Sequence, residues 1–262
     1  MAKTKDGKEL REEFEFWGWK WETCMENERP LHPNNPRYYI DCDNVITLAN
    51  SNLCILSMEF KPTCINWWDS KWKTKIDYYP KYSAGCIKSI DTVQVNSIIE
   101  ADLKFPAGEN LWPSFWLTAC DSWPPEIDIV EGYTDSKGSY KDGLNFHWHW
   151  PFIYREYRLE SNVHYKGINE EHFQVGAKAV HPKVLNLPLE YNWNHFKCVW
   201  TSNSIRIYIN DNLVREVTDE SVLSRMKTKG MWVIFNIWPN DKYNLTTHKH
   251  FYLIKDFKVT KL

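Results

Sequence analysis

Glu-Ile-Asp-Ile-Val-Glu, at residues 126–131, is the stretch that decides how the rest of this chain is interpreted. It places three carboxylates in a run of β-branched residues, which favours a strand. Burying carboxylates in a strand costs free energy unless they are paired, so such a strand is expected to need them for a function. Segments that carry tryptophan precede it at 112–117 and 123–125, and a solvent-facing edge strand would not usually carry so much aromatic surface. We therefore interpret the stretch as a catalytic group of acids rather than as a charged edge.

The three acids reach one face only if the strand is irregular. Side chains on a strand alternate between its two faces, so Glu126 and Asp128 share one face. Strict alternation would turn Glu131 into the core. One extra residue, a β-bulge near Ile129-Val130, restores the phase. The sequence therefore predicts a bulge that lines up Glu126, Asp128 and Glu131 on one surface.

Length and composition indicate one aromatic-rich β domain. A chain of 262 residues has room for one large β domain or two small ones. We expect a single domain with a sizeable core, because all-β sandwiches of this size are commonly single domains. The 15 tryptophans and 14 tyrosines exceed what a core needs and suit the stacking of flat sugar faces on rings. An aromatic-rich core is the alternative explanation, and both can apply.

Charge and hydropathy exclude several classes of partner. The formal net charge is −2 and no Lys/Arg block stands out, so no nucleic-acid partner is expected. The longest apolar run, residues 231–238, is too short to span a membrane. No apolar signal segment opens the chain, so we expect either a processed form or a virion-associated protein, with the compartment unassigned. The seven cysteines include no C-x-x-C pair and are odd in number, which favours mostly free, buried thiols.

Short segments separated by turn signals predict a dozen or so strands with almost no helix. This pattern predicts an all-β fold, a two-sheet antiparallel β-sandwich of the jelly-roll, lectin-like kind with a concave substrate cleft. Residues 1–33 form a charged lead-in with a short helix over 10–16, and residues 34–262 form the single domain. One further helix is expected at 219–226, with Asp219 as its N-cap. The strands are expected at 38–42, 52–60, 83–89, 95–105, 112–119, 126–133, 144–150, 161–165, 195–201, 205–209, 213–217, 231–238 and 251–259.

Alternation within these strands predicts which polar and aromatic side chains join the acids. The candidates are two tryptophans before the acids, a histidine after them and two residues of a late strand: Trp112, Trp116, His147, Asn236 and Trp238. For each tryptophan, core packing is an equally good explanation, and for the histidine a solvated strand position is. His147 and His149 form a His-x-His pair, but no third ligand is evident, so no metal site is predicted.

The run W-P-S-F-W-L-T at 112–118, followed by E-I-D-I-V-E, resembles glycoside hydrolase family 16, which includes laminarinases, lichenases, agarases and carrageenases. The spacing E-x-D-x-x-E is similar to the bulge-containing, laminarinase-like branch, whereas lichenases have E-x-D-x-E. The resemblance covers roughly residues 40–262. Departures from the family pattern at Cys86, Asn96, Asp102 and Leu111 concern the sugar subsites and the substrate rather than the acids.

This resemblance implies a retaining, endo-acting hydrolase of internal β-glycosidic bonds, with β-1,3-glucan of the laminarin type or a related galactan as substrate. Glu126 would be the nucleophile and Glu131 the acid and base, their carboxyl groups roughly 5–5.5 Å apart. Asp128 would hydrogen-bond Glu126 and help to set the protonation of the group. Trp116 would stack on the sugar at the cleavage point, and Trp112 and Trp238 would serve neighbouring subsites.

The resemblance also bears on partners and cofactors. The expected partner is a polysaccharide or oligosaccharide, and the protein is expected to be a monomer that requires no cofactor. Relatives often hold a structural calcium ion away from the cleft, although no ligand cluster in this sequence can be named. Three alternatives stay open: a non-catalytic, lectin-like glycan-binding module, a transglycosylase with the same site, and a structural virion protein with a vestigial site.

Overall fold

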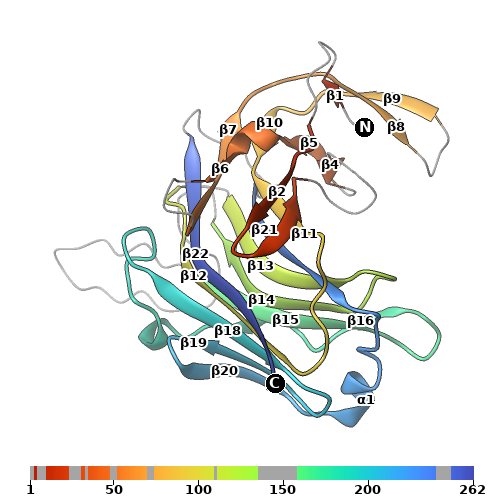
Figure 1. Cartoon of the computed structure of the whole chain (residues 1–262), viewed down its shortest axis with the longest axis vertical. Coiled ribbons are helices and arrows are strands. Elements are labelled where there is room, and N and C mark those ends of the chain that lie inside the picture. Colours follow the sequence, from red (N-terminus) through yellow and green to blue (C-terminus); the bar gives the residue numbers. More distant parts are fainter. Residues whose placement is uncertain are drawn as a thin grey trace.

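The computed structural model describes residues 3–4, 10–23, 31–32, 35–47, 52–69, 74–108, 111–134, 158–239 and 249–262. Within these residues the chain is almost entirely β-structure, and two large sheets pack face to face (Figure 1). The predicted all-β, two-sheet sandwich is therefore confirmed. In the part that the structure describes, no helix is both long enough and apolar enough to cross a membrane.

The first large sheet contains ten strands and carries the C-terminal strand near its middle. Its neighbouring strands are antiparallel, except that β10 and β5 are parallel. In spatial order the strands are β20 (Asn212–Val217), β19 (Ile205–Ile209), β18 (Asn194–Trp200), β12 (Ser97–Lys104), β22 (His250–Lys261), β7 (Leu53–Phe60), β10 (Tyr82–Ala84), β5 (Asn35–Ile40) and β4 (Leu31–His32), with β6 (Val45–Thr47) beside β7.

The second large sheet contains nine strands and carries the acidic stretch. In spatial order they are β16 (His172–Gln174), β15 (Arg158–Lys166), β14 (Glu126–Tyr133), β13 (Leu111–Ala119), β21 (Met231–Pro239), β11 (Cys86–Ser89), β3 (Trp19–Glu22) and β2 (Glu13–Phe16), with β17 (Lys178–Ala179) beside β15. A small third sheet joins β1 (Lys3–Thr4), β8 (Ile65–Asp69) and β9 (Thr74–Tyr78).

The described helices are short. They are the 3₁₀ turns η2 (Cys42–Asn44) and η3 (Pro182–Val184) and the helix α1 (Glu220–Leu223). The side chain of Asp219 accepts a hydrogen bond of 2.8 Å from the backbone N–H of Ser221, so the predicted N-cap is confirmed.

The core lies between the two large sheets because their inner faces are apolar on alternate residues. Burial alternates along β12, β18 and β19, and the inward side chains meet those of β13, β14 and β21. The rings of Phe115 on β13 and Phe235 on β21 stack at 4.4 Å between centroids in the core, beside the acidic strand. The acids of β14 are thereby mounted on a close-packed layer rather than on a loop.

The N-terminal segment differs from the sequence prediction. The helix expected over 10–16 is wrong: β2 and β3 form a hairpin at one edge of the nine-stranded sheet. Trp17 and Gly18 connect the strands with φ values of 53° and 73°, the left-handed geometry of a tight hairpin turn. The alternating Glu and Phe residues of 13–16 are the strand signal that the helix prediction overlooked.

Most other predicted strands are confirmed to within a few residues, and 126–133 and 205–209 match their predicted bounds. The strand predicted at 83–89 is divided at Gly85 between β10 of one sheet and β11 of the other. A Cβ at Gly85 would lie 2.9 Å from the Leu56 Cβ, so the close approach requires glycine here. The strand predicted at 144–150 lies outside the described residues.

Candidate active site

The acidic strand carries the predicted bulge. Across the β13–β14 ladder, Trp116 faces Asp128 and Phe115 faces Val130, so the register shifts by one residue between these pairs. The same shift appears against β15, between Asp128 and Glu131. Ile129 and Val130 are both fully buried, which shows that two successive residues point into the core. The bulge brings Glu131 to the face that already carries Glu126 and Asp128.

We call this surface the acid face. On it the strand register brings the tryptophans of β13 next to β14 on one side and to β21 on the other. It contains the three acids and four of the five predicted sugar-binding residues: Glu126, Asp128, Glu131, Trp112, Trp116, Asn236 and Trp238. The fifth, His147, lies outside the described residues.

Glu131 is held by two donors that reach the same oxygen. The Trp112 Nε1–H and the Tyr133 hydroxyl donate to Glu131 Oε1 at 3.0 and 2.8 Å. Among the described residues, no hydrogen bond reaches Oε2. Burial raises the pKa of Glu131, and the two donated hydrogen bonds oppose that shift. A proton on this carboxyl group therefore belongs on Oε2, because Oε1 is already accepting.

Glu126 is contacted by an indole and an imidazole. The Trp123 Nε1–H donates to Glu126 Oε2 at 2.8 Å, and the His164 Nε2 lies 3.6 Å from Oε1. Burial and the nearby Asp128 raise the pKa of Glu126 well above its usual range, while His164 opposes the shift. The sequence reasoning missed His164, although Asn162 and His164 alternate on one face of the strand predicted at 161–165.

Asp128 is the most deeply buried of the three acids, with 3% of its surface exposed. It shares a hydrogen bond with Glu126, and its Oδ2 lies 3.0 Å from His164 Nε2. Two carboxyl groups can share a hydrogen bond only if one of them holds a proton. Burial and the charge of Glu131 raise the pKa of Asp128 well above its usual range, and the buried Arg215 beneath the sheet opposes the shift.

These raised pKa values predict how stability changes with pH. An acid with a raised folded-state pKa stays protonated after its unfolded counterpart has ionised, so the fold loses stability as pH rises from about 4 toward the raised value. Asp128→Asn removes this titration. We compare the free energy of unfolding of the variant with that of the unmodified protein at pH 4 and at pH 8. We expect the difference, variant minus unmodified, to be at least about 1 kcal/mol larger at pH 8 than at pH 4.

Denaturant unfolding at the two pH values measures the effect. Asp211→Asn is the matched control, because this aspartate is exposed and pairs with Lys197 on the surface. A difference between the Asp128→Asn variant and the unmodified protein that stays constant from pH 4 to pH 8 would contradict the burial argument.

The aromatic part of the acid face is built around Asn236. The Trp116 Nε1–H donates to Asn236 Oδ1 at 2.7 Å, and the Asn236 amide donates to the Trp112 carbonyl at 3.3 Å. Trp238 meets Trp112 and Trp116 edge-on, at 5.6 and 6.2 Å between centroids. Asn236 and Trp238 are buried, whereas Trp112 and Trp116 keep exposed surface. Sugar contacts by any of the four remain predictions.

Two described clusters have the side-chain spacing of a metal site, namely Asp41, Cys42 and Asp43, and the set Glu126, Asp128 and His164. The first does not fit calcium, because calcium prefers oxygen ligands and Asp41 is engaged by Lys61 at 3.1 Å. In the second, histidine and carboxylates hydrogen-bond one another. Neither of these two clusters is therefore an all-oxygen set suited to calcium, and a structural calcium ion elsewhere in the protein stays a prediction.

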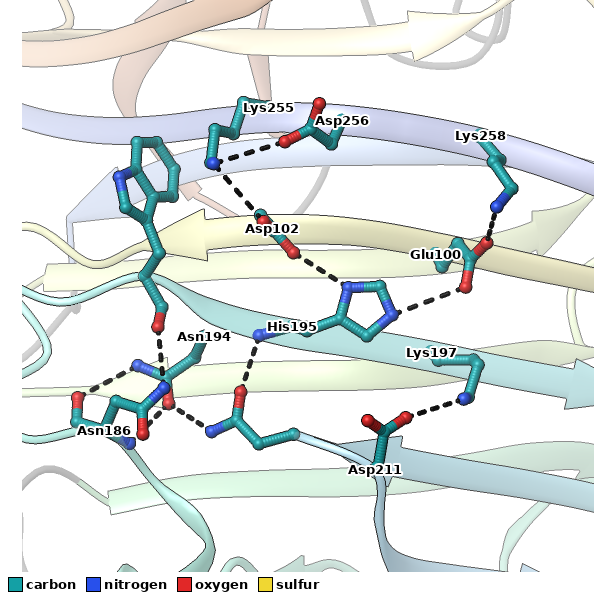
Figure 2. A network of polar contacts seen from close by, with 12 residues as sticks. Glu100, Asp102, Asn186, Asn194, His195, Lys197, Asp211, Lys255, Asp256 and Lys258 are labelled. Atoms are coloured by element: carbon teal, nitrogen blue, oxygen red, sulfur yellow. Dashed lines mark hydrogen bonds and ion pairs between the residues drawn. The ribbon is translucent and has the colours of Figure 1, made fainter.

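A second polar cluster lies on the outer face of the ten-stranded sheet, away from the acids (Figure 2). It lines a pocket of about 490 Å³. His195 stands between Asp102 and Glu100, at 2.8 and 3.4 Å. Lysines of β22 neutralise both carboxylates: Lys258 lies 2.6 Å from Glu100 and Lys255 3.5 Å from Asp102. These cross-strand pairs join β12, β18 and β22, and we assign them a structural role.

Comparison with known proteins gives the same picture as the geometry. The family model for glycosyl hydrolases family 16 matches residues 58–253, which is most of the chain. A galactan endo-β-1,3-galactanase from Flammulina velutipes is 35% identical over 54 residues. That match covers 19% of this chain and 22% of the relative, so it compares only a segment of each protein.

Solved structures share the fold at low sequence identity. The κ-carrageenase from Pseudoalteromonas carrageenovora, in complex with an oligotetrasaccharide of κ-carrageenan, superposes with a TM-score of 0.60. It is 14% identical, and the match covers 99% of this chain and 94% of that chain. The endo-β-1,3-glucanase from Pyrococcus furiosus gives a TM-score of 0.56 at 18% identity, covering 95% and 99%. At such identities the likeness supports the fold alone.

Proposed function

The chain belongs to glycosyl hydrolases family 16, and from this membership we propose that it is a retaining, endo-acting hydrolase that cleaves internal bonds of a β-1,3-glucan or a related galactan. The observation that carries the proposal is the bulge in β14, because it gives three carboxyl groups a common face. Hydrolysis with retention requires two such groups in different protonation states.

Glu126 is the proposed nucleophile. Its carboxylate attacks the anomeric carbon, a covalent glycosyl ester forms, and the bond to the leaving sugar breaks. The hydrogen bond from the Trp123 indole to Oε2 supports this role, since it fixes the direction of the carboxylate. The proton shared with Asp128 gives Glu126 a neutral partner that does not repel its charge.

Glu131 is the proposed acid and base. As the bond breaks, the proton on Oε2 passes to the leaving oxygen; the resulting carboxylate then takes a proton from water, whose oxygen releases the sugar from Glu126. Two donors on Oε1 support this role, because they leave Oε2 to carry the proton. Burial supports it too, since it keeps the group protonated at higher pH than an exposed glutamate.

The proposed substrate class rests on the relatives. The segment relative is named for β-1,3-galactan, one structural neighbour for κ-carrageenan and another for β-1,3-glucan. β-1,3-Glucan and related galactans are therefore the first substrates to test. The half-buried tryptophans of the acid face supply flat apolar surface suited to a sugar ring.

A polysaccharide panel tests the function. The protein is incubated with laminarin, lichenan, agarose, κ-carrageenan and β-1,3-galactan, and new reducing ends are measured. Endo-cleavage gives a ladder of intermediate products, and the anomer released first reports retention by NMR. Products longer than the substrate would indicate a transglycosylase, and binding without new reducing ends would indicate a lectin-like module. Either outcome overturns the hydrolase assignment.

Trp116 is predicted to form the sugar platform at the point of cleavage. Trp116→Ala is expected to lower kcat/KM on the preferred glycan by about 10-fold or more, because stacking surface is lost and ~1.4 kcal/mol corresponds to each factor of ten. Kinetics on soluble glycan measure this, with circular dichroism to check folding.

Trp116→Phe is the matched control for this prediction. It keeps a flat ring, smaller than the indole, and removes the N–H that Asn236 accepts. We expect it to retain most of the activity. Equal losses in the alanine and phenylalanine variants would assign the effect to the hydrogen bond rather than to stacking.

A further inference from the structure

His172 touches two groups that each hold Glu126. Its Nε2 lies 2.7 Å from the Nδ1 of His164, and its ring lies 4.6 Å from the ring of Trp123. His164 in turn reaches Asp128 at 3.0 Å and Glu126 at 3.6 Å, and Trp123 donates to Glu126 at 2.8 Å. The contacts therefore form a closed ring that starts and ends at the proposed nucleophile.

The members of this ring come from three separate segments. Trp123 precedes β14, His164 lies on β15, and His172 lies on the short outer strand β16. Trp123 is 49% exposed, so burial alone does not fix its orientation. The β15–β16 ladder pairs His172 with Lys166, beside His164, and thereby sets the two imidazoles next to each other. Their rings stack at an interplanar angle of 23°.

Hydrogen-bond chemistry gives the contact between the two histidines a direction. With the Asp128 proton directed toward Glu126, Asp128 Oδ2 accepts, so the Nε2 of His164 carries a hydrogen. In a neutral His164 the Nδ1 is then a lone pair, and His172 must donate its Nε2–H to it. If His164 takes up a proton, Nδ1–H donates outward instead. The hydrogen bond between His164 and His172 therefore persists when one of the two rings is protonated. It is lost when both rings are protonated, because neither facing nitrogen can then accept.

We propose that His172 is a positioning residue of this site, which orients His164 and Trp123 and through them holds Glu126 in the direction needed for attack. This inference rests on the proposed function, because it gives His172 a part in the reaction of Glu126. His172 acts through its two neighbours. Burial and the neighbouring His164 lower the pKa of His172, which keeps it neutral and able to donate to a neutral His164.

Other charged groups around the pair bear on any pH effect. The carboxyl groups lie on β14, on β15 and in the turn between β15 and β16, and the cations lie on β15 and beneath the sheet. On the acid face these are Glu126, Asp128, Glu131 and Glu160; around the histidines they are Lys166 with its partner Glu170, and Arg215 beneath. None of these groups changes in a His172 variant. A shifted pH profile therefore reports altered contacts of His164 and Trp123 with the acids.

Three variants test the proposal through kinetics. His172→Phe keeps a ring against Trp123 but loses the N–H, and we expect kcat to fall about 10-fold with KM within about twofold. The acid limb of kcat/KM should move to higher pH, because His164 then opposes the raised pKa of Glu126 less effectively. His172→Gln restores a donor and should recover much of both changes. Phe173→Leu, on the other face of β16, is the control and should leave both unchanged.

A second readout needs no substrate. In nitrogen-15 NMR of the full chain, His172→Phe should shift the His164 ring signals and the Trp123 indole signal, whereas Phe173→Leu should not. Unmoved signals, or an unmoved acid limb, would overturn the role of His172. Shifted signals in a protein that cleaves no glycan would support the positioning contact and instead refute the proposed function.

Discussion

Replacing Glu126 by glutamine is expected to lower kcat on a soluble β-1,3-glucan or galactan by ~10,000-fold or more, since the step that forms the glycosyl ester has no nucleophile. Glutamine has the same shape and its amide oxygen can still accept from Trp123. Glycan affinity should therefore stay within about threefold. Initial rates from reducing ends, together with a binding titration, measure the two quantities separately.

Two further variants sharpen this assignment. With Glu126→Gly and added azide, the azide attacks the anomeric carbon directly, and the product has inverted configuration. Glu220→Gln, at an exposed glutamate of α1, is the control and should keep full activity. More than a tenth of normal activity in Glu126→Gln would remove Glu126 from the nucleophile role.

Replacing Glu131 by glutamine is expected to produce a loss that depends on the leaving group. On the natural glycan kcat should fall by ~1,000-fold or more, because no group protonates the departing oxygen. A dinitrophenyl glycoside needs no such proton, so its first step should persist as a burst of one dinitrophenolate per enzyme. The glycosyl ester then accumulates, because no base activates water.

Azide distinguishes the two glutamates. In Glu131→Gln it should restore turnover with retained configuration, whereas at Glu126 it gives inversion. The alkaline limb of the pH profile should also disappear from the first step, because the raised pKa of Glu131 sets that limb in the unmodified enzyme. Equal losses on both substrates would contradict the assignment of Glu131 as the acid.

Much of the acidic strand could be predicted by counting residues along it, because each residue's position in the strand determines its face. Side chains on a strand alternate, and only an extra residue lets Glu131 share a face with Glu126. The bulge at Ile129 and Val130 follows from that phase alone, and the structure confirms it. The E-x-D-x-x-E pattern is therefore informative about the backbone and about which carboxyl groups share a face.

The contacts that shift the pKa values of the acids could not be predicted from the sequence to the same extent. His164 pairs with Glu126 only because β15 lies beside β14, and nothing in the sequence specifies that register. Trp123 was noted as aromatic context, yet its N–H bond to Glu126 requires a particular path of the chain before β14. Arg215 lies on the opposite sheet and reaches Ser161 beneath the acids through the core. Such partners depend on strand order, which alternation does not encode.

In the N-terminal segment the sequence did contain the signal, but the prediction gave it too little weight. Its alternation was visible over residues 13–16, but the high charge of the region favoured a lead-in with a short helix. The edge of the nine-stranded sheet decided the outcome, because it offers unpaired backbone groups to a hairpin that already has a tight turn.

The sequence by itself determined the all-β class, the bulged strand and the identity of the three acids, because these follow from local periodicity and from the cost of burying charge. Only the tertiary structure decided which neighbours hold those acids. Strand order, bulge geometry and burial bring Trp112, Tyr133, Trp123 and His164 to particular carboxylate oxygens. Those contacts join residues on different strands and loops, so they exist only once the sheet has assembled.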